Sequence, residues 1–310
     1  MQIRVIIAGP TASGKSSLSV KVAEKINGEI ISVDSRQCYR KIDIGTAKPS
    51  AEDLNRIPHH NISILDLNEE DSVADFKNRA DKYASDIEKR GKSVIYCGGS
   101  TLHLQSIFHP LDDIPTSNNE NLQKLSHQEK EKGLQSLYDI LLEVDPEYAQ
   151  KMDGLNRQRI FRALDVWMQT GKPFSSFHTR DDATLPDNML FFALHHPRKV
   201  LHQRISDRTE QMFKLGLIEE TRQILENGID PGVQSLKTVG YREVIDYLHG
   251  KITLEKAKKN IKTSTRRYAK RQITWLRRWP FVKWLDRHEN NEAKLTEKIC
   301  QELAALSQKG

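Results

Sequence analysis

The segment from residue 3 to residue 26 constrains the fold of this chain more than any other. Residues 3–8 are mostly valine and isoleucine, which is typical of a strand buried on both faces of a parallel sheet. The next eight residues, GPTASGKS, fit the pattern G-x-x-x-x-G-K-[ST], and Leu18, Val22 and Ile26 follow at helical spacing. A strand, a glycine-rich turn and a helix in this order predict a phosphate-binding loop.

The residue types in this loop suit an anion. Glycines let the backbone wrap around an anion, whose oxygens bind backbone N–H groups and the helix N-terminus. Lys15 can bridge phosphates and Ser16 can hold Mg²⁺, whereas a purely structural glycine turn would need neither residue. The predicted phosphate-binding residues are Gly9, Pro10, Thr11, Ala12, Ser13, Gly14, Lys15 and Ser16. The reaction stays open at this point, because a nucleoside triphosphate and a diphosphate leaving group both fit such a loop.

The order of elements predicts an α/β fold with an insertion. Further strands are expected at 29–33, 93–97 and 190–194, and residues 72–90 have helical periodicity. This alternation predicts a P-loop NTPase-like parallel sheet flanked by helices. Residues 121–170 indicate successive short helices without strand signals. We therefore expect an inserted all-helical domain over 116–186 and a catalytic core made of 1–115 and 187–310.

Composition excludes several classes of protein. The 310 residues are 37% hydrophobic and 29% charged, which excludes a disordered chain. The longest uncharged run, 93–111, is too polar to form a membrane-spanning helix. No secretory signal pattern is recognisable at the N-terminus, and the three cysteines stand at unrelated spacings. We expect a cytoplasmic protein without disulfides, without a cysteine-based zinc site and without membrane association.

Positive charge is concentrated in one segment. Residues 256–278 contain ten lysines and arginines and no acidic residue. The net charge of the whole chain is +6, so the remainder, with 38 basic and 42 acidic residues, carries −4. This separation predicts a local contact with a polyanion, although a solvated helix face would have the same pattern.

Asp34 follows the predicted strand 29–33, at the sheet edge where ligands bind in open α/β sheets. It could serve as a general base there. The alternatives are a helix N-cap before residues 35–39 or a metal-bound carboxylate.

Several longer motifs resemble one family. They read ISVDSRQCYRKIDIGTAKPS, IPHHNISILD, CGGST, RQRIFRALDVWMQTGK, LHQRISDRTEQM, LKTVGYREVIDYL and TRRYAKRQITWLRRW, in chain order. Together with GPTASGKS they are similar to the bacterial type of the tRNA dimethylallyltransferase (isopentenylpyrophosphate transferase) family. The resemblance covers nearly the whole chain.

The resemblance implies a chemical role for particular residues. The phosphate loop would hold the diphosphate of dimethylallyl diphosphate, with Mg²⁺ on Ser16, and Asp34 would accept a hydrogen bond or proton from the amine of the target adenine. Arg208 matches a diphosphate-contacting arginine. Arg204, one turn earlier, either joins it or pairs with a neighbouring carboxylate such as Asp207.

The glycine pair at 98–99 departs from the family pattern. The family usually has threonine directly after the two glycines, and here Ser100 precedes Thr101. Both hydroxyls are therefore candidates for a catalytic contact, and a helix cap at Ser100 is the alternative.

The resemblance also implies contacts with the tRNA anticodon loop. The matching residues are Asp34, Ser35, Arg36, Gln37, Cys38, Thr101, Gln158, Arg159, Ile160, Phe161, Arg162, Val239, Gly240, Tyr241, Arg242, Lys270, Arg271, Gln272, Trp275 and Arg277. Tyr268, Trp275 and Trp279 alternate with basic residues, as on a base-stacking surface, although Trp275 equally suits a core. His59 and His60 are expected to be structural or substrate-loop residues, since no further metal ligands stand at suitable spacing.

The expected activity is transfer of the dimethylallyl group to the N6 amine of the adenine next to the tRNA anticodon on its 3′ side. The products would be N6-dimethylallyladenosine and diphosphate, and the cofactor would be Mg²⁺. The protein would be a monomer that binds the anticodon stem-loop. Three alternatives remain: prenylation of free AMP or ADP, a kinase that uses the loop on ATP, and a non-catalytic RNA-binding protein. The basic segment argues against the first, because a mononucleotide needs no such surface.

Overall fold

The chain separates into two compact units in a computed structural model that describes residues 3–177 and 183–308. The first unit comprises Met1–His109 and Ala183–Gly310, and the second comprises Pro110–Asp182. The expected boundaries, after residue 115 and before residue 187, lie a few residues farther along the chain than these divisions.

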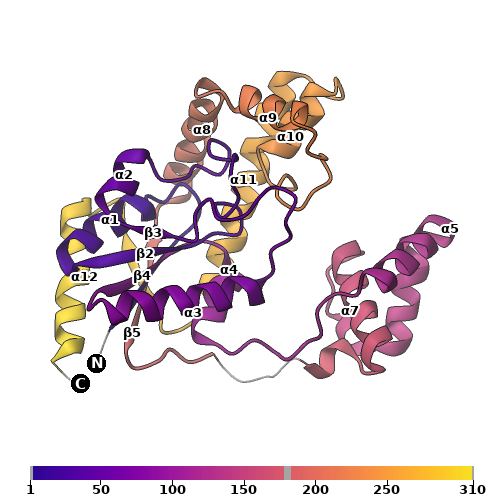
Figure 1. Cartoon of the computed structure of the whole chain (residues 1–310), viewed down its shortest axis with the longest axis horizontal. Helices are drawn as coiled ribbons and strands as arrows, with labels where there is room; N and C mark the ends of the chain where they lie inside the picture. Colours follow the sequence, from indigo (N-terminus) through magenta and orange to yellow (C-terminus); the bar gives the residue numbers. More distant parts are fainter. Residues whose placement is uncertain (1–2, 178–182, 309–310) are drawn as a thin grey trace. The chain divides into compact units, whose positions relative to one another are not determined.

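Six parallel strands form the sheet of the first unit, in the order β3-β2-β4-β1-β5-β6 (Figure 1). They are β1 (Arg4–Ala8), β2 (Gly28–Val33), β3 (His59–His60), β4 (Ser93–Gly98), β5 (Met189–His195) and β6 (Lys283–Asp286). The four predicted strands are confirmed to within one residue at each end. The two edge strands were missed, because β3 has only two residues and only Leu285 of β6 is fully buried.

Both faces of the sheet are covered by helices. Ile6 and Ala8 point toward α3 (Val73–Lys89) and α4 (Thr101–Phe108). Val5 and Ile7 point to the opposite face, toward α1 (Lys15–Ile26) and α12 (Glu292–Ser307). Since successive side chains alternate between faces, a strand with two covered faces is a continuous apolar run. This confirms the interpretation of residues 3–8 and the helix predicted over 72–90.

A group of helices follows β5 in the chain: α8 (Arg198–Lys214), α9 (Leu217–Glu226), α10 (Tyr241–Leu248) and α11 (Leu254–Leu276). The first two are separate helices, because Gly216 adopts φ 100° between α8 and α9. These helices enclose Tyr39, Ile42 and Tyr241 in a separate core. The short helix α2 (Ala51–Arg56) begins at Ser50, whose side chain accepts a hydrogen bond from the backbone N–H of Asp53. Within the described residues, no helix has the length and apolar character needed to cross a membrane.

The second unit is helical in the part that the structure describes. It contains α5 (Asn119–Val144), α6 (Pro146–Gln150), α7 (Arg157–Thr170) and the 3₁₀ helix η1 (Phe174–Phe177). Gly133, with φ 79° and ψ 165°, divides α5 into two helices, which confirms the expected succession of short helices. Leu137, Leu141 and Ile160 lie in its core. Residues 178–182 of the expected insertion lie outside the described residues.

A buried carboxylate links β2 to the edge of the sheet. The Glu29 side chain is 3% exposed and forms ion pairs with Arg90 at 2.6 Å and Lys92 at 2.8 Å, and its Oε2 lies 2.7 Å from His60 Nε2. Burial by itself raises the pKa of Glu29, but hydrogen bonds from Lys92, His60 and Arg90 outweigh it and hold that pKa at about 2. His60 therefore has a structural role, which is one of the two roles predicted for it from the sequence.

We expect Glu29→Gln to lower the free energy of unfolding by about 1–3 kcal/mol at pH 7, since it removes the charged partner of three groups. The Glu29 contribution is present above its ordinary pKa of 4.5 and is lost as the pH falls toward 2, because the folded state depresses that pKa. Urea unfolding between pH 7 and pH 2.5 measures this. Glu24→Gln, which breaks an ion pair with Arg56 whose two side chains are 41% exposed, should lower the free energy of unfolding much less, because solvent screens an exposed pair. Equal losses in the two variants would contradict the prediction.

Candidate active site

A cavity of about 550 Å³ opens where the carboxyl ends of β1, β2 and β4 meet. The volume is in the range of small-molecule sites. Its walls come from the phosphate loop, from the segment after β2, and from α8 and α11. Among its lining residues are Lys15, Ser16, Asp34, Arg208, Tyr268 and Arg271. The structure therefore brings the predicted phosphate loop, the predicted base and the predicted diphosphate-binding arginine to one place.

The phosphate loop has the conformation that its sequence predicts. It follows β1 directly and ends at Gly14, the N-cap of α1, which adopts φ 87°. A Cβ atom on Gly9 would lie 2.8 Å from Ser13 Oγ, so this position has no room for a side chain. Thr11, Lys15 and Ser16 line the cavity. The rest of the loop supports them: Gly9, Pro10 and Ser13 are buried, and Ala12 and Gly14 are half-buried.

Three side chains hold the loop from outside. Arg204 Nε donates to the carbonyl oxygen of Ala12 at 2.7 Å, and His196 Nε2 lies 2.9 Å from that of Ser13. Gln272 Oε1 accepts a hydrogen bond from the backbone N–H of Thr11 at 2.9 Å. Arg204 thus binds the loop backbone, neither pairing with Asp207 nor lining the cavity beside Arg208. Sequence spacing placed the two arginines on one face of α8 but could not show that this face meets the loop.

Two cations, Lys15 and Arg208, line the cavity together with the Asp34 carboxylate. Burial lowers the pKa of the Lys15 ammonium, and Arg208 lowers it further, against Cys97 and Asp34, which raise it. Burial likewise lowers the pKa of Arg208, which Asp34 raises. Within the described residues neither Lys15 nor Arg208 forms an ion pair. An anion bound here would remove an electrostatic penalty that the protein carries in its absence.

Asp34 uses one carboxylate oxygen to organise the turn after β2. Its Oδ1 accepts hydrogen bonds from the backbone N–H groups of Arg36 at 2.9 Å and Gln37 at 3.2 Å. Its Oδ2 has no hydrogen-bond partner among the described residues. Oδ1 therefore caps a turn, but the helix predicted by the N-cap alternative is absent, because residues 35–38 form only a turn. Oδ2 remains for a ligand in the cavity.

The two candidate hydroxyls after the glycine pair lie differently. Ser100 is 8% exposed, and its Oγ accepts a hydrogen bond from the backbone N–H of Ser35 at 3.1 Å. It occupies the N-cap position of α4 without capping it, and Thr101 begins the helix. In the described cavity wall β4 contributes Cys97 and Gly98, whereas Ser100 and Thr101 are not part of the lining. Ser100 therefore stabilises the turn that contains Asp34. Its position favours this structural role over direct contact with a substrate.

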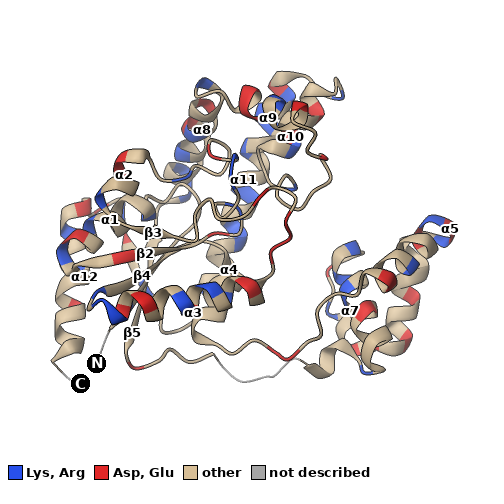
Figure 2. Cartoon of the chain, viewed as in Figure 1, with Lys and Arg blue, Asp and Glu red and all other residues tan. Residues whose placement is uncertain are grey.

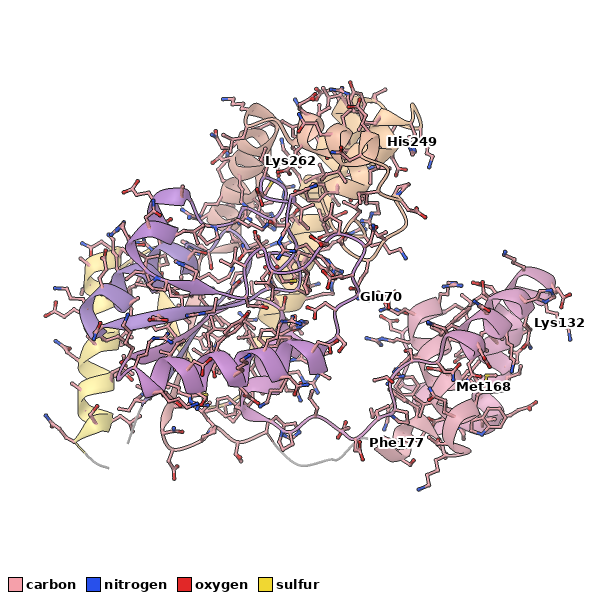
Figure 3. The ribbon with its side chains drawn as sticks, viewed as in Figure 1. Glu70, Lys132, Met168, Phe177, His249 and Lys262 are labelled. Carbon is pink, nitrogen blue, oxygen red and sulfur yellow. The ribbon has the colours of Figure 1, made fainter. Side chains whose placement is uncertain are left out.

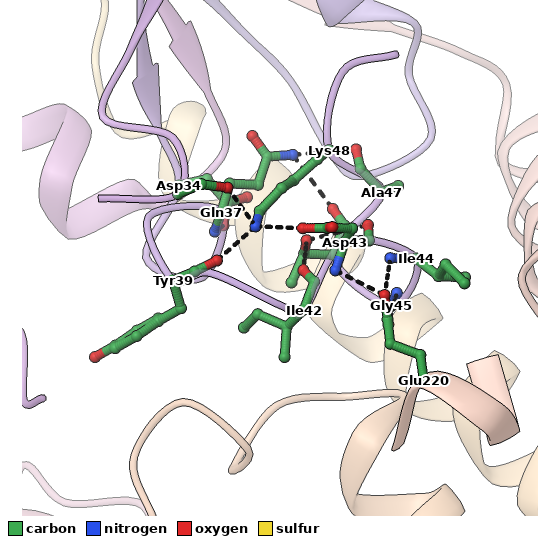
Figure 4. Close-up of polar contacts among 12 residues, drawn as sticks. Asp34, Gln37, Tyr39, Ile42, Asp43, Ile44, Gly45, Ala47, Lys48 and Glu220 are labelled. Atoms are coloured by element: carbon green, nitrogen blue, oxygen red, sulfur yellow. Dashed lines mark hydrogen bonds and ion pairs between the residues drawn. The ribbon is translucent and has the colours of Figure 1, made fainter. Parts of the chain in front are cut away.

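The segment 43–48, between β2 and α2, is fixed by residues that sequence reasoning missed (Figure 4). Glu220 accepts hydrogen bonds from the backbone N–H groups of Asp43 and Ile44, both at 3.0 Å. Lys48 is 6% exposed and donates to Tyr39 O, Asp43 Oδ1 and Ser63 Oγ. This segment forms part of the cavity wall through Gly45, Thr46 and Ala47. The spacing of charges gave no signal, because Glu220 is far from this segment in the chain.

The predicted tRNA contacts fall into two groups in space. Arg36, Gln37, Val239, Arg242, Arg271 and Gln272 line the cavity of the first unit. Gln158, Arg159, Ile160, Phe161 and Arg162 lie on α7 of the second unit, where Gln158 and Arg159 are exposed. Lys270 and Arg277 are exposed on or next to α11.

Some predicted contacts have buried side chains instead. Cys38, Ile160 and Tyr241 are fully buried, Gln272 is 2% exposed and Phe161 6%. The Tyr241 hydroxyl donates to Glu220 and accepts from the backbone N–H of Gly45 at 3.0 Å. Burial of these side chains is at odds with direct contact to RNA. Gly240, also buried, begins α10 at φ 106°, a conformation that favours glycine.

The aromatic residues of the basic segment have different surroundings. Trp279 is 7% exposed and packs among Phe108, Phe191 and Phe281, so it belongs to the core and the stacking prediction for it is wrong. Trp275 packs partly against the same core, which supports the alternative interpretation. Tyr268 lines the cavity. Burial raises the pKa of its hydroxyl to about 12, so this side chain stays neutral.

Lysines and arginines gather along α11 (Figure 2). Lys258 and Lys262 of α11 both form ion pairs with Glu210 of α8, and the Lys262 pair has a distance of 2.6 Å. Lys262 is labelled in Figure 3. Arg267 and Arg271 line the cavity. Lys270, Arg277 and Arg278 are exposed and form no ion pair within the described residues. The positive charge of α11 is therefore partly neutralised by Glu210 near the beginning of the helix, whereas the described residues offer no ion pair to the basic side chains near its end.

A family model described as IPP transferase matches residues 37–279, well over half of the chain. The chain belongs to the IPP transferase family. The resemblance inferred from its motifs is thereby confirmed, although the matched span begins after the phosphate loop and Asp34.

Relatives match the chain over nearly its whole length. The tRNA dimethylallyltransferase of Carboxydothermus hydrogenoformans is 43% identical over 300 residues, 96% of each chain. That of Pelotomaculum thermopropionicum is 38% identical over 98% of this chain and 96% of its own. Among solved structures, the full-length tRNA isopentenylpyrophosphate transferase of Bacillus halodurans has a TM-score of 0.72 and 36% identity, over 99% of each chain. A eukaryotic dimethylallyltransferase acting on tRNA has a TM-score of 0.77 and 31% identity, over 92% of this chain and 74% of its own.

Proposed function

We propose that this protein moves the dimethylallyl group from dimethylallyl diphosphate to the N6 amine of the adenine immediately 3′ of a tRNA anticodon, releasing diphosphate. One observation carries the proposal: the cavity holds Lys15, Arg208 and Asp34, and among the described residues neither cation forms an ion pair and Asp34 Oδ2 has no hydrogen-bond partner. The cations suit a diphosphate leaving group, and the carboxylate suits an amine nucleophile. Relatives named tRNA dimethylallyltransferase support the choice of substrates.

In this mechanism the protein positions two reactants and stabilises a leaving group. Lys15, Arg208 and the N-terminus of α1 would stabilise charge that develops on the diphosphate as its C–O bond breaks. Asp34 Oδ2 would accept a hydrogen bond or the proton from the N6 amine as the new C–N bond forms. Because the allylic carbon stabilises positive charge by resonance, positioning and leaving-group stabilisation supply most of the rate.

We also propose Mg²⁺ as the cofactor, bound with the donor. The Ser16 hydroxyl lines the cavity beside Lys15, and Mg²⁺ commonly takes few protein oxygens together with phosphate oxygens and water. Within residues 3–177 and 183–308 no group of three histidine, cysteine or acidic side chains could hold a metal ion alone. The diphosphate would therefore complete the ligand set. When bound, the ion would neutralise charge on the leaving group.

The proposed partner is the anticodon stem-loop. An enzyme that alkylates a base must first take it out of the stack, which costs little for an unpaired loop base. Arg36, Arg242 and Arg271 at the cavity can bind backbone phosphates, and exposed Arg159 of the helical unit offers a further contact. We propose that the protein acts as a monomer in the cytoplasm, where tRNA is used.

Mass spectrometry of nucleosides tests the function directly. Unmodified anticodon stem-loop is incubated with the protein, Mg²⁺ and dimethylallyl diphosphate, and N6-dimethylallyladenosine is expected, with none formed in the presence of EDTA. Parallel reactions contain AMP in place of RNA, or ATP in place of the prenyl donor. Modification of AMP but not of the stem-loop would overturn the RNA assignment, and consumption of ATP with transfer of its phosphate would favour a kinase.

The exposed end of α11 should determine the salt dependence of RNA binding. We expect Lys270→Ala and Arg277→Ala each to weaken binding and to reduce the slope of log K against log salt concentration by about 0.7, the value for one lost single-strand phosphate contact. Titrations of a labelled stem-loop at several salt concentrations measure the slope. The diphosphate affinity of the free protein should stay unchanged.

Lys262→Ala is the matched control, because Lys262 is already paired with Glu210. It should leave the slope nearly as it is. A slope that falls equally in all three variants would show that the response reflects net charge and not the exposed end of the helix.

A further inference from the structure

One buried amide joins the basic helix to the phosphate loop. Gln272 lies on α11 and is 2% exposed. Its Oε1 accepts a hydrogen bond from the backbone N–H of Thr11 at 2.9 Å, and its Nε2 donates to the carbonyl oxygen of Gly99 at 2.7 Å. Since only the NH₂ group can donate to a carbonyl, the amide has a single orientation. It therefore connects α11, the phosphate loop and the end of β4.

Gly99, whose carbonyl oxygen accepts the hydrogen bond from Gln272, has no room for a side chain. A Cβ atom on Gly99 would overlap Gln272 Nε2 and would lie 3.0 Å from the carbonyl oxygen of Gly9. The approach of Gln272 to the backbone thus depends on glycine at this position. This explains the second glycine of CGGST without a contact to a ligand.

The neighbours of Gln272 on α11 line the cavity or are exposed to solvent. Tyr268, one turn earlier, and Arg271, the adjacent residue, line the cavity. Lys270 and Arg277 are exposed on or next to the same helix. One rigid helix therefore carries both the proposed RNA contacts and the hydrogen bond that positions Thr11 at the cavity wall. A displacement of α11 along its axis would therefore move the acceptor of the Thr11 N–H group.

We propose that Gln272 is a positioning residue that couples RNA binding on α11 to the geometry of the phosphate loop. This inference rests on the proposed function, because it takes RNA as the ligand of α11 and diphosphate as the ligand of the loop. RNA that fixes α11 also fixes Thr11, so the loop loses less freedom when diphosphate binds. Coupling of binding is reciprocal, and diphosphate must tighten RNA binding by the same factor.

Calorimetric titration with inorganic diphosphate and Mg²⁺ measures the coupling, once with the free protein and once with protein saturated with unmodified stem-loop. We expect the stem-loop to raise diphosphate affinity about 5-fold or more in the wild type. Gln272→Met keeps the side-chain volume and removes both hydrogen bonds, and it should abolish that enhancement while RNA affinity changes by less than about twofold. Gln301→Met, the same substitution on the exposed face of α12, should leave the enhancement intact.

A second variant, Gly99→Ala, disturbs the Gln272 amide without changing Gln272 itself. Gly99→Ala displaces Gln272 Nε2 by steric overlap and should also abolish the enhancement, so the test stands even where Gln272→Met does not fold. A wild type without enhancement, or a folded Gln272→Met variant with the full enhancement, would overturn the inference. The measurement needs no prenyl transfer: a wild type that shows the coupling but modifies no stem-loop would overturn the proposed function alone.

Discussion

Replacing Asp34 with asparagine is expected to lower kcat for prenyl transfer by about 10²–10⁴-fold, the usual contribution of a positioned acid or base. Asparagine keeps the Oδ1 acceptor that the backbone N–H groups of Arg36 and Gln37 use, so the turn after β2 is preserved. It replaces the free Oδ2 by a donor, which cannot accept a proton from the adenine amine. Single-turnover assays with saturating stem-loop and dimethylallyl diphosphate measure the effect.

Asp34→Ala separates the two tasks of this carboxylate. Alanine removes both the turn acceptor and the free oxygen, and it should lose at least as much turnover as asparagine while the stem-loop still binds. An Asp34→Asn variant with nearly wild-type turnover would show that the carboxylate serves only to cap the turn.

Lys15→Met should lower kcat by about 10²–10³-fold, the loss typical of removing one electrostatic contact to a developing negative charge. Methionine fills similar space without the charge, and Arg208 is then the remaining cation of the pair that faces the leaving group. Release of diphosphate in a coupled assay measures the rate. Lys25→Met, an exposed lysine on the same helix, should retain wild-type turnover.

The neutral amine form of Lys15 should also take up a proton when diphosphate binds at alkaline pH. Burial lowers its pKa in the free protein, and an anion beside it raises that pKa again, so binding favours the protonated form. Calorimetry in two buffers of different ionisation enthalpy measures this uptake. It should disappear in Lys15→Met, and uptake that persists in the variant would assign the proton to another group.

The local features of the catalytic core could be predicted because their causes are local. A strand with apolar residues in continuous sequence must be buried on both faces, and GPTASGKS has the glycines that a tight turn into a helix requires. Residue 34 follows a buried strand, so its place at the ligand edge of the sheet depended only on the strands being parallel.

The predicted tRNA contacts show where this reasoning reaches its limit. A motif marks residues that matter, and it does not say which partner they touch. Tyr241 stands next to exposed Arg242, yet its hydroxyl binds Glu220 and Gly45 inside the protein. Trp279 directly follows Arg277 and Arg278 in the sequence, yet it packs in the aromatic core. Helical spacing predicts which residues share a face, but it does not identify the surface that this face meets.

The sequence by itself determined the parallel α/β core, the phosphate loop, the aspartate at the end of β2 and the helical insertion. Each depends on the chemistry of residues within a few turns of one another. Only the tertiary structure decided that Gln272 and Arg204 hold the loop backbone, that Glu220 fixes the cavity wall, and that Lys15 and Arg208 meet Asp34 in one cavity. These contacts join residues far apart in the chain, and packing of the elements against one another brings them within hydrogen-bond distance.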